Sequence, residues 1–149
     1  MKILILGSNG FIGSSLKKYF LCKPDLYEVL FPKRDELNLL NYFCCEDYLK
    51  KNKPDIIINC AVEEKNIENT LRIFFNTLSF KDYFGKMIYL GSGAEYNPKK
   101  YLPLMKEDYS KTDWPTFGYP FSKWLIGDYI EKQNSQKVIN LRLFGVYGN

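Results

Sequence analysis

Short apolar runs alternate along the chain with segments whose apolar residues recur every three or four positions. The first run, residues 2–6, is rich in Ile and Leu and predicts a fully buried strand. In residues 11–20, Ile12, Leu16 and Phe20 recur at intervals of four, which predicts a helix with one apolar face. The chain is therefore expected to begin with a strand, a glycine-containing turn and a helix.

The same alternation continues to the end of the chain. It predicts further strands over residues 27–31, 56–62, 86–92 and 137–144. It predicts further helices over residues 40–51, 66–78 and 120–132, and a loop over residues 93–117. Strands that alternate with helices indicate βαβ units, so the predicted fold class is α/β: a doubly wound parallel sheet of the Rossmann type in three α/β/α layers. Ligands of such sheets bind at the carboxyl ends of the strands.

Composition fits a single domain over residues 1–149 and excludes several function classes. The 21 Lys and Arg residues against 17 Asp and Glu give a net charge of +4, and they are scattered rather than clustered, so no nucleic-acid partner is expected. No apolar run is long enough for a membrane span or a signal peptide. A cytoplasmic protein without a membrane partner is the resulting expectation.

Four cysteines and the absence of histidine limit the chemistry that is available. Paired C-x-x-C spacing is absent from Cys22, Cys44, Cys45 and Cys60, so no metal site is predicted and reduced structural thiols are expected. Without histidine, proton transfer has to come from Tyr, Lys, Asp or Glu.

Gly7, Gly10 and Gly13 lie between the first predicted strand and the first predicted helix. Spacing alone is weak evidence, since three glycines in this pattern also suit a purely structural turn. Their position favours phosphate binding, because the free N–H groups and the dipole of a helix N-terminus attract negative charge.

The spacing Gly7-x-x-Gly10-x-x-Gly13 resembles that of the extended short-chain dehydrogenase/reductase family, the NAD-dependent epimerases, dehydratases and reductases of nucleotide sugars. The resemblance implies that Gly7 permits a tight turn, that Gly10 lets a pyrophosphate approach, and that Gly13 lets the helix pack on the strand. It also implies cofactor contacts from three further residues of the loop: Asn9, Phe11 and Ile12.

The stretch KRDELNLLN, residues 33–41, is similar to the matching segment of GDP-L-fucose synthases. An Arg at the end of the second strand suits the 2′-phosphate of NADP, so Arg34 is the predicted contact and NADP is preferred over NAD. Asp35 leaves NAD as an alternative cofactor, because an acidic residue here suits a ribose 2′-hydroxyl. The alternative for Lys33 and Arg34 is that both are solvated loop charges. The resemblance further implies two residues at the adenine, Asn38 and Leu39, and two at the cofactor ribose, Cys60 and Ala61.

A Tyr followed four residues later by a Lys occurs three times, at Tyr19/Lys23, Tyr96/Lys100 and Tyr119/Lys123. Tyr119 alone opens a predicted helix downstream of a strand that ends in Gly-Ser, as the family's Y-x-x-x-K motif does. The segment LGSGAEY, residues 90–96, resembles the family's serine position and makes Ser92 the third predicted catalytic residue. The alternatives are a packing aromatic for Tyr119 and a strand-end capping hydroxyl for Ser92.

The resemblance implies a role for each of these three residues. Tyr119 moves a proton to or from a sugar hydroxyl, Ser92 hydrogen bonds the same oxygen, and Lys123 also holds the cofactor ribose. A free Tyr has a pKa near ~10, and the ammonium group of Lys123 together with an oxidised nicotinamide is expected to lower it. Hydride transfer between the nicotinamide and the sugar carbon is the cofactor's contribution.

Departures from the family's sequence patterns reduce the number of reactions that the chain is expected to catalyse. Gly93 and Ala94 stand where dehydratases carry Asp-Glu, and Ala94 also stands where GDP-L-fucose synthases carry a cysteine. What remains is redox chemistry at one carbon of a nucleotide sugar, by a 4-epimerase or a 4-keto reductase.

The rival hypotheses are a dinucleotide-binding module without turnover and a plain mononucleotide-binding domain. Gly145 replaces an asparagine of the family, and family members continue past the position of Asn149 into a substrate-binding lobe. That lobe is expected to be absent or truncated. A homodimer through the helices that flank the site is implied by the resemblance.

Overall fold

The computed structural model describes the backbone of residues 1–148, and the side chains of these residues except those at positions 98 and 110. Asn149, the last residue of the predicted domain, lies outside the described residues. The described chain contains one five-stranded sheet in the order β2-β1-β3-β4-β5, with every neighbouring pair parallel. Its strands are β1 (Lys2–Leu6), β2 (Glu28–Leu30), β3 (Ile56–Asn59), β4 (Lys86–Ser92) and β5 (Val138–Leu143).

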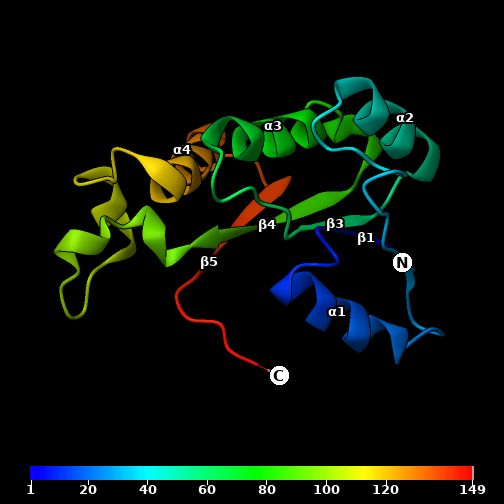
Figure 1. Cartoon of the computed structure of the whole chain (residues 1–149), viewed down its shortest axis with the longest axis horizontal. Coiled ribbons are helices and arrows are strands. Elements are labelled where there is room, and N and C mark those ends of the chain that lie inside the picture. The colour runs from blue at the N-terminus through cyan, green and yellow to red at the C-terminus, as the bar shows by residue number, and fades with distance from the viewer. Residues whose placement is uncertain (149) are drawn as a thin grey trace.

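Helices cover both faces of the sheet, which confirms the predicted three-layer arrangement. Figure 1 shows α1 on one face and α2, α3 and α4 together on the other face. The helices are α1 (Phe11–Leu21), α2 (Tyr42–Asn52), α3 (Ile67–Leu78) and α4 (Gly118–Gln133). No helix within residues 1–148 is long and apolar enough to cross a membrane.

The core lies between the sheet and the layer of three helices. Phe74 of α3 is completely buried, and its ring meets that of Tyr89 of β4 edge to face, with ring centroids 5.1 Å apart. Leu49 of α2 and Ile126 of α4 are buried in the same cluster. Apolar side chains from all three of these helices therefore pack against the sheet.

Each predicted strand and helix is present, with differences at the ends. The strand predicted over residues 56–62 ends at Asn59, because the Asn59 side chain accepts a hydrogen bond from the N–H of Ala61 (3.1 Å) and turns the chain. The predicted loop contains three short 3-10 helices: Gly93–Glu95, Pro98–Lys100 and Glu107–Lys111. A fourth, Lys81–Tyr83, precedes β4.

Strand order reverses between β1 and β3, which are adjacent in the sheet although β2 lies between them in sequence. Leu6 at the end of β1 pairs with Asn59 at the end of β3, so the loops that follow both strands leave the sheet side by side. A crevice at such a reversal is where doubly wound sheets bind ligands. The ends of β4 and β5 also lie together, since Ser92 pairs with Leu143.

Candidate cofactor and catalytic site

The turn after β1 depends on glycine at two positions. Gly7 has a φ of +73°, and its carbonyl oxygen accepts a hydrogen bond from the N–H of Gly10 (3.0 Å). A Cβ on Gly7 would lie 2.8 Å from the backbone of Ala61, and a Cβ on Gly13 would overlap the carbonyl oxygen of Gly7. Gly13 thus allows α1 to begin directly against the turn.

Gly10 leaves space on the outside of the same turn. A Cβ built there would meet only the carbonyl oxygen of Gly7, at 3.4 Å. Gly10 is also the N-cap of α1, and no side chain caps the helix. The first turn contains no acidic residue, so the N-terminus of this helix offers free N–H groups and a positive dipole end to an anion.

A cavity of about 320 Å³ lies outside the carboxyl ends of β1 and β3. Arg34 lines this cavity, whereas Lys33 and Asp35 do not. Residues 37–40, which line this cavity, are held against α3 by a hydrogen bond from Asn76 to the carbonyl oxygen of Leu39 (2.9 Å). The predicted cofactor residues that line it are Gly7, Asn9, Gly10, Arg34, Asn38, Leu39, Cys60 and Ala61.

A second cavity, of about 400 Å³, lies beside the first, at the ends of β3 and β4. The two cavities share Gly10, Cys60 and Val62, so an elongated ligand can extend from one to the other along the start of α1. The other predicted residues that line the second cavity are Phe11, Ile12, Gly13, Ser92, Tyr119 and Lys123.

The first turns of α4 bring Tyr119 and Lys123 to this cavity. Lys123 is only 4% exposed, and its Nζ donates a hydrogen bond to the carbonyl oxygen of Leu90 (2.7 Å). Nζ also lies 4.4 Å from the ring centroid of Tyr89 and 5.7 Å from that of Tyr119. The Lys is therefore fixed between β4 and the tyrosine ring.

The two other Tyr/Lys pairs lie elsewhere. Lys23 donates a hydrogen bond to the hydroxyl of Tyr19 (2.7 Å) on the exposed end of α1. Lys100 forms an ion pair with Asp113 (2.8 Å). Neither pair lines the two cavities, whereas Tyr119 and Lys123 both line the second.

Electrostatics at Tyr119 differ from the sequence expectation of a lowered pKa. Burial raises the pKa of Tyr119, a hydrogen bond with Ser92 opposes this, and the charges of Glu64 and Glu95 raise it further. Lys123 is directed to the carbonyl oxygen of Leu90, and burial lowers its own pKa to about 8. The protein alone thus favours a protonated phenol.

Ser92 both caps a turn at the end of β4 and faces the second cavity. Its hydroxyl oxygen accepts a hydrogen bond from the N–H of Ala94 (3.1 Å), which is the capping bond of the alternative hypothesis. The same hydroxyl lines the cavity and hydrogen bonds with Tyr119. Because the oxygen already accepts from Ala94, its proton is available to an oxygen in the cavity.

Sequence reasoning missed the carboxylate that holds Ser92. Glu95 is 1% exposed and accepts a hydrogen bond from the N–H of Ser92 (3.0 Å). It also accepts from the Nε of Arg142 (2.7 Å) and the amide of Asn140 (3.0 Å), and Arg142 continues to Glu131 of α4. The signal was present as the S-x-x-E capping box of residues 92–95.

The pKa values of the pair reflect this burial. Burial raises the pKa of Glu95, while the hydrogen bonds from Arg142, Ser92 and Asn140 oppose the increase. Against its own burial, the hydrogen bonds to Glu95 and Glu131 raise the pKa of Arg142. Gly91 and Gly127 make room for this network, because a Cβ on either would overlap the Glu95 carboxylate.

Glu64, in the loop between β3 and α3, is a second residue that the sequence did not indicate. It lines the cavity of Ser92, Tyr119 and Lys123. No sequence motif marks it, since only the folded loop brings it to the opening.

Cys60 lies where the two cavities join. Burial raises the pKa of its thiol to about 11, and the charge of Lys123 opposes this. A thiol with this pKa stays protonated at neutral pH and is a poor nucleophile. The described residues contain no group of three or more His, Cys, Asp or Glu side chains that could hold a metal ion.

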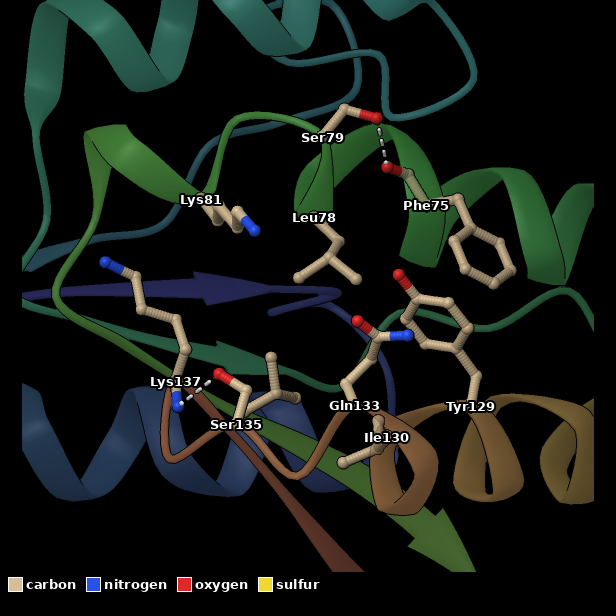
Figure 2. Close-up of a pocket in the computed structure, with 10 residues that line it drawn as sticks. Phe75, Leu78, Ser79, Lys81, Tyr129, Ile130, Gln133, Ser135 and Lys137 are labelled. Atoms are coloured by element: carbon tan, nitrogen blue, oxygen red, sulfur yellow. Dashed lines mark hydrogen bonds between the residues drawn. The ribbon is translucent and has the colours of Figure 1, made fainter.

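A further cavity, of about 220 Å³, lies away from the carboxyl ends of the strands, between the C-terminal parts of α3 and α4 and the start of β5. Figure 2 shows Phe75, Leu78 and Tyr129 around it. None of the predicted site residues lines this cavity. The two adjoining cavities at the carboxyl ends of the strands therefore form the candidate site.

Comparison with known proteins identifies the family of this chain. Residues 3–149 match the NAD dependent epimerase/dehydratase family. The chain belongs to this family. The roles predicted for the glycine turn, for Ser92 and for the Tyr119/Lys123 pair of this epimerase/dehydratase family member stay predictions.

Relatives of this family member include several GDP-sugar enzymes. It is 28% identical to GDP-L-colitose synthase of Yersinia pseudotuberculosis, over 99% of this chain and 54% of that protein. It is 25% identical to the NADP-bound GDP-mannoheptose C4 reductase of Campylobacter jejuni, with a TM-score of 0.83 over 98% of this chain and 52% of that one.

A second solved structure from the same organism, a GDP-D-glycero-L-gluco-heptose synthase in the presence of NADPH, is also 25% identical. Its TM-score is 0.84, over 99% of this chain and 48% of that one. The chain thus spans about half the length of the relatives it matches.

Lys123→Met is expected to change how the free energy of unfolding depends on pH. The pKa of Lys123 is about 8 in the folded protein against an ordinary value of 10.5, so below pH 8 both folded and unfolded wild-type chains are protonated. Between these values only the unfolded chain keeps the proton, and burial of the charge no longer costs stability. The wild type should therefore gain about 3 kcal/mol relative to the variant from pH 8 to pH 10.5.

Urea unfolding of both proteins at a series of pH values measures this difference. Titrating groups remote from position 123 cancel, and the thiol of Cys60, whose pKa of about 11 the charge of Lys123 lowers, titrates mainly above this range. A stability difference that stays constant across this range would contradict the assigned environment of Lys123.

Proposed function

We propose that this chain is the dinucleotide-binding and catalytic half of an NADPH-dependent reductase that acts on the 4-keto group of a GDP-linked sugar. One observation carries the proposal. Ser92, Tyr119 and Lys123 line a single cavity with the uncapped N-terminus of α1, where an anionic cofactor fits. The names of the relatives, a GDP-L-colitose synthase and a GDP-mannoheptose C4 reductase, support the choice of a GDP sugar.

The described residues fit a dinucleotide. Space beside Gly10 and the free N–H groups at the start of α1 suit the diphosphate. Asn38 and Leu39 would border the adenine in the first cavity, where Arg34 would meet a 2′-phosphate. Lys123 would hold the ribose in the second cavity. Bound NADPH supplies the hydride that reduces the sugar carbonyl carbon.

Protons are supplied by the chain itself. Tyr119, kept protonated by burial, donates its phenolic proton to the carbonyl oxygen as the alcohol forms. The hydroxyl of Ser92 donates a hydrogen bond to the same oxygen and stabilises its developing negative charge. Lys123 lies one helical turn from Tyr119 and is fixed by its hydrogen bond to the carbonyl oxygen of Leu90. From there its charge stabilises the phenolate left after the transfer.

Reduction is favoured over 4-epimerisation by the same environment. An epimerase must first oxidise a sugar hydroxyl, which requires Tyr119 as a base. Burial and the charges of Glu64 and Glu95 raise the pKa of this phenol and favour the acid form. Dehydration is disfavoured by Gly93 and Ala94, which supply neither an acid nor a base.

Arg34→Ala is expected to weaken NADP⁺ binding about tenfold, the value of one half-exposed charge pair, and to leave NAD⁺ binding unchanged. Lys33→Ala is the matched control, because Lys33 is the neighbouring exposed cation that does not line the cavity. Calorimetric titration with both cofactors measures the effect. Equal loss for NADP⁺ and NAD⁺ would contradict a contact with the 2′-phosphate.

Tyr119→Phe is expected to lower kcat for reduction of a GDP-linked 4-keto sugar about 10²- to 10⁴-fold, because the proton donor is lost. Binding of NADPH should stay within about twofold, since the ring remains. Tyr19→Phe is the matched control: it belongs to a Tyr/Lys pair of the same spacing outside the cavity. Unchanged turnover in Tyr119→Phe would exclude the assigned donor. If the wild-type protein binds NADPH but shows no turnover, the non-catalytic module is favoured instead.

We also propose a homodimer through α3 and α4, as the resemblance implies. Phe75 of α3 is 36% exposed, and its ring meets that of Tyr129 of α4 at a centroid distance of 5.0 Å (Figure 2). A second copy would cover this aromatic pair by two-fold symmetry.

Phe75→Glu is expected to shift the protein from dimer to monomer at micromolar concentrations, because it puts a charge into the proposed interface. Phe43→Glu on α2, where the Phe is 71% exposed, should leave the dimer intact. Sedimentation equilibrium distinguishes the two outcomes. A monomeric wild type would overturn the proposal.

A further inference from the structure

The cavity that contains Tyr119 and Lys123 has one acidic lining residue among those the structure describes, Glu64. Glu64 is exposed and precedes α3 in the loop after β3. Its carboxylate interacts with the ammonium group of Lys123 through charge.

The charge of Glu64 is felt inside the cavity. It raises the pKa of Tyr119 and also opposes the lowering of the pKa of Lys123. Both effects have the same sign: the carboxylate favours positive charge in the cavity and disfavours negative charge. Glu95 acts in the same direction, but it does not line the cavity and its charge is balanced by Arg142.

The two redox forms of a nicotinamide dinucleotide differ in charge at the nicotinamide ring. The ring is cationic when oxidised and neutral when reduced, while the phosphates and the adenine end are the same in both forms. A fixed charge beside the ring therefore discriminates between the forms, whereas a fixed charge beside the adenine end acts on both alike.

We propose that Glu64 makes this cavity bind the oxidised, cationic form of the dinucleotide more tightly than the chain would bind it without that carboxylate, with little effect on the reduced form. The inference rests on the proposed function in one respect, that the nicotinamide end enters the cavity of Tyr119. Preferential stabilisation of the oxidised product favours transfer of the hydride from the cofactor to the sugar carbonyl. Lys123, the cation that lines the same cavity, acts in the opposite sense, and Glu64 offsets it.

Glu64→Gln tests the proposal, because it removes the charge and keeps the shape of the side chain. The affinity for NADP⁺ is expected to fall about three- to tenfold, as for a charge pair in a partly hydrated cavity, and that for NADPH to stay within about twofold. Fluorescence and calorimetric titrations of the whole chain, without any sugar substrate, measure both dissociation constants.

Glu63→Gln is the matched control. Glu63 is the adjacent residue of the same loop, but it lines the first cavity and not the second. This variant is expected to leave the ratio of the two dissociation constants unchanged. Thermal unfolding of both variants checks that neither substitution disturbs the fold.

Three results would overturn the proposal: an equal loss of affinity for both forms in Glu64→Gln, no change for either form, or an equal change of the ratio in Glu63→Gln. Its failure is distinguishable from failure of the proposed function. A shifted ratio in a protein that reduces no GDP-linked 4-keto sugar would refute the reductase alone. Turnover with an unshifted ratio would refute only the role of Glu64.

Discussion

The carboxylate of Glu95 is the interaction on which the candidate site depends. It joins the N–H of Ser92 at the end of β4 to Asn140 and Arg142 of β5, and Arg142 carries the connection on to Glu131 of α4. Three elements that supply the cavity are thus fixed to one buried charge. Breaking such a pair by removing one partner is strongly destabilising, because the other charge is left buried and unpaired. The serine is therefore held by long-range contacts and not by its own strand alone.

Opposing electrostatic effects meet around this centre. Burial raises the pKa of Tyr119, which favours the protonated phenol, and lowers the pKa of Lys123 to about 8, closer to neutral pH. The glycine turn at the other end carries no side-chain charge and uses backbone N–H groups instead. One end of the crevice is suited to binding an anion, and the other to moving a proton.

Local patterns were enough to predict the fold, because apolar periodicity reports directly which face of each element is buried. The position of a Tyr/Lys pair relative to a strand end can also be read from the chain, and the pair chosen on that ground, Tyr119/Lys123, is the one that lines the second cavity. The pKa of Tyr119 is raised chiefly by burial, which local patterns do not report, and Lys123 bonds to a carbonyl 33 residues earlier in sequence. The expected lowering by an oxidised nicotinamide stays a prediction. The partners of Glu95 lie 45 and 47 residues away, and Glu64 reaches the cavity only through the path of its loop. The assignment of the site residues to a cofactor stays a prediction.

Contact between Gly7 and Gly13 has a consequence for the affinity with which a ligand is bound. The start of α1 packs so closely on the carbonyl group of the turn that not even a methyl group fits between them. The amide groups that would meet a diphosphate are consequently aimed before any ligand arrives. Little conformational entropy is then lost in ordering the loop on association, so more of the attraction between the helix end and the anion appears as affinity.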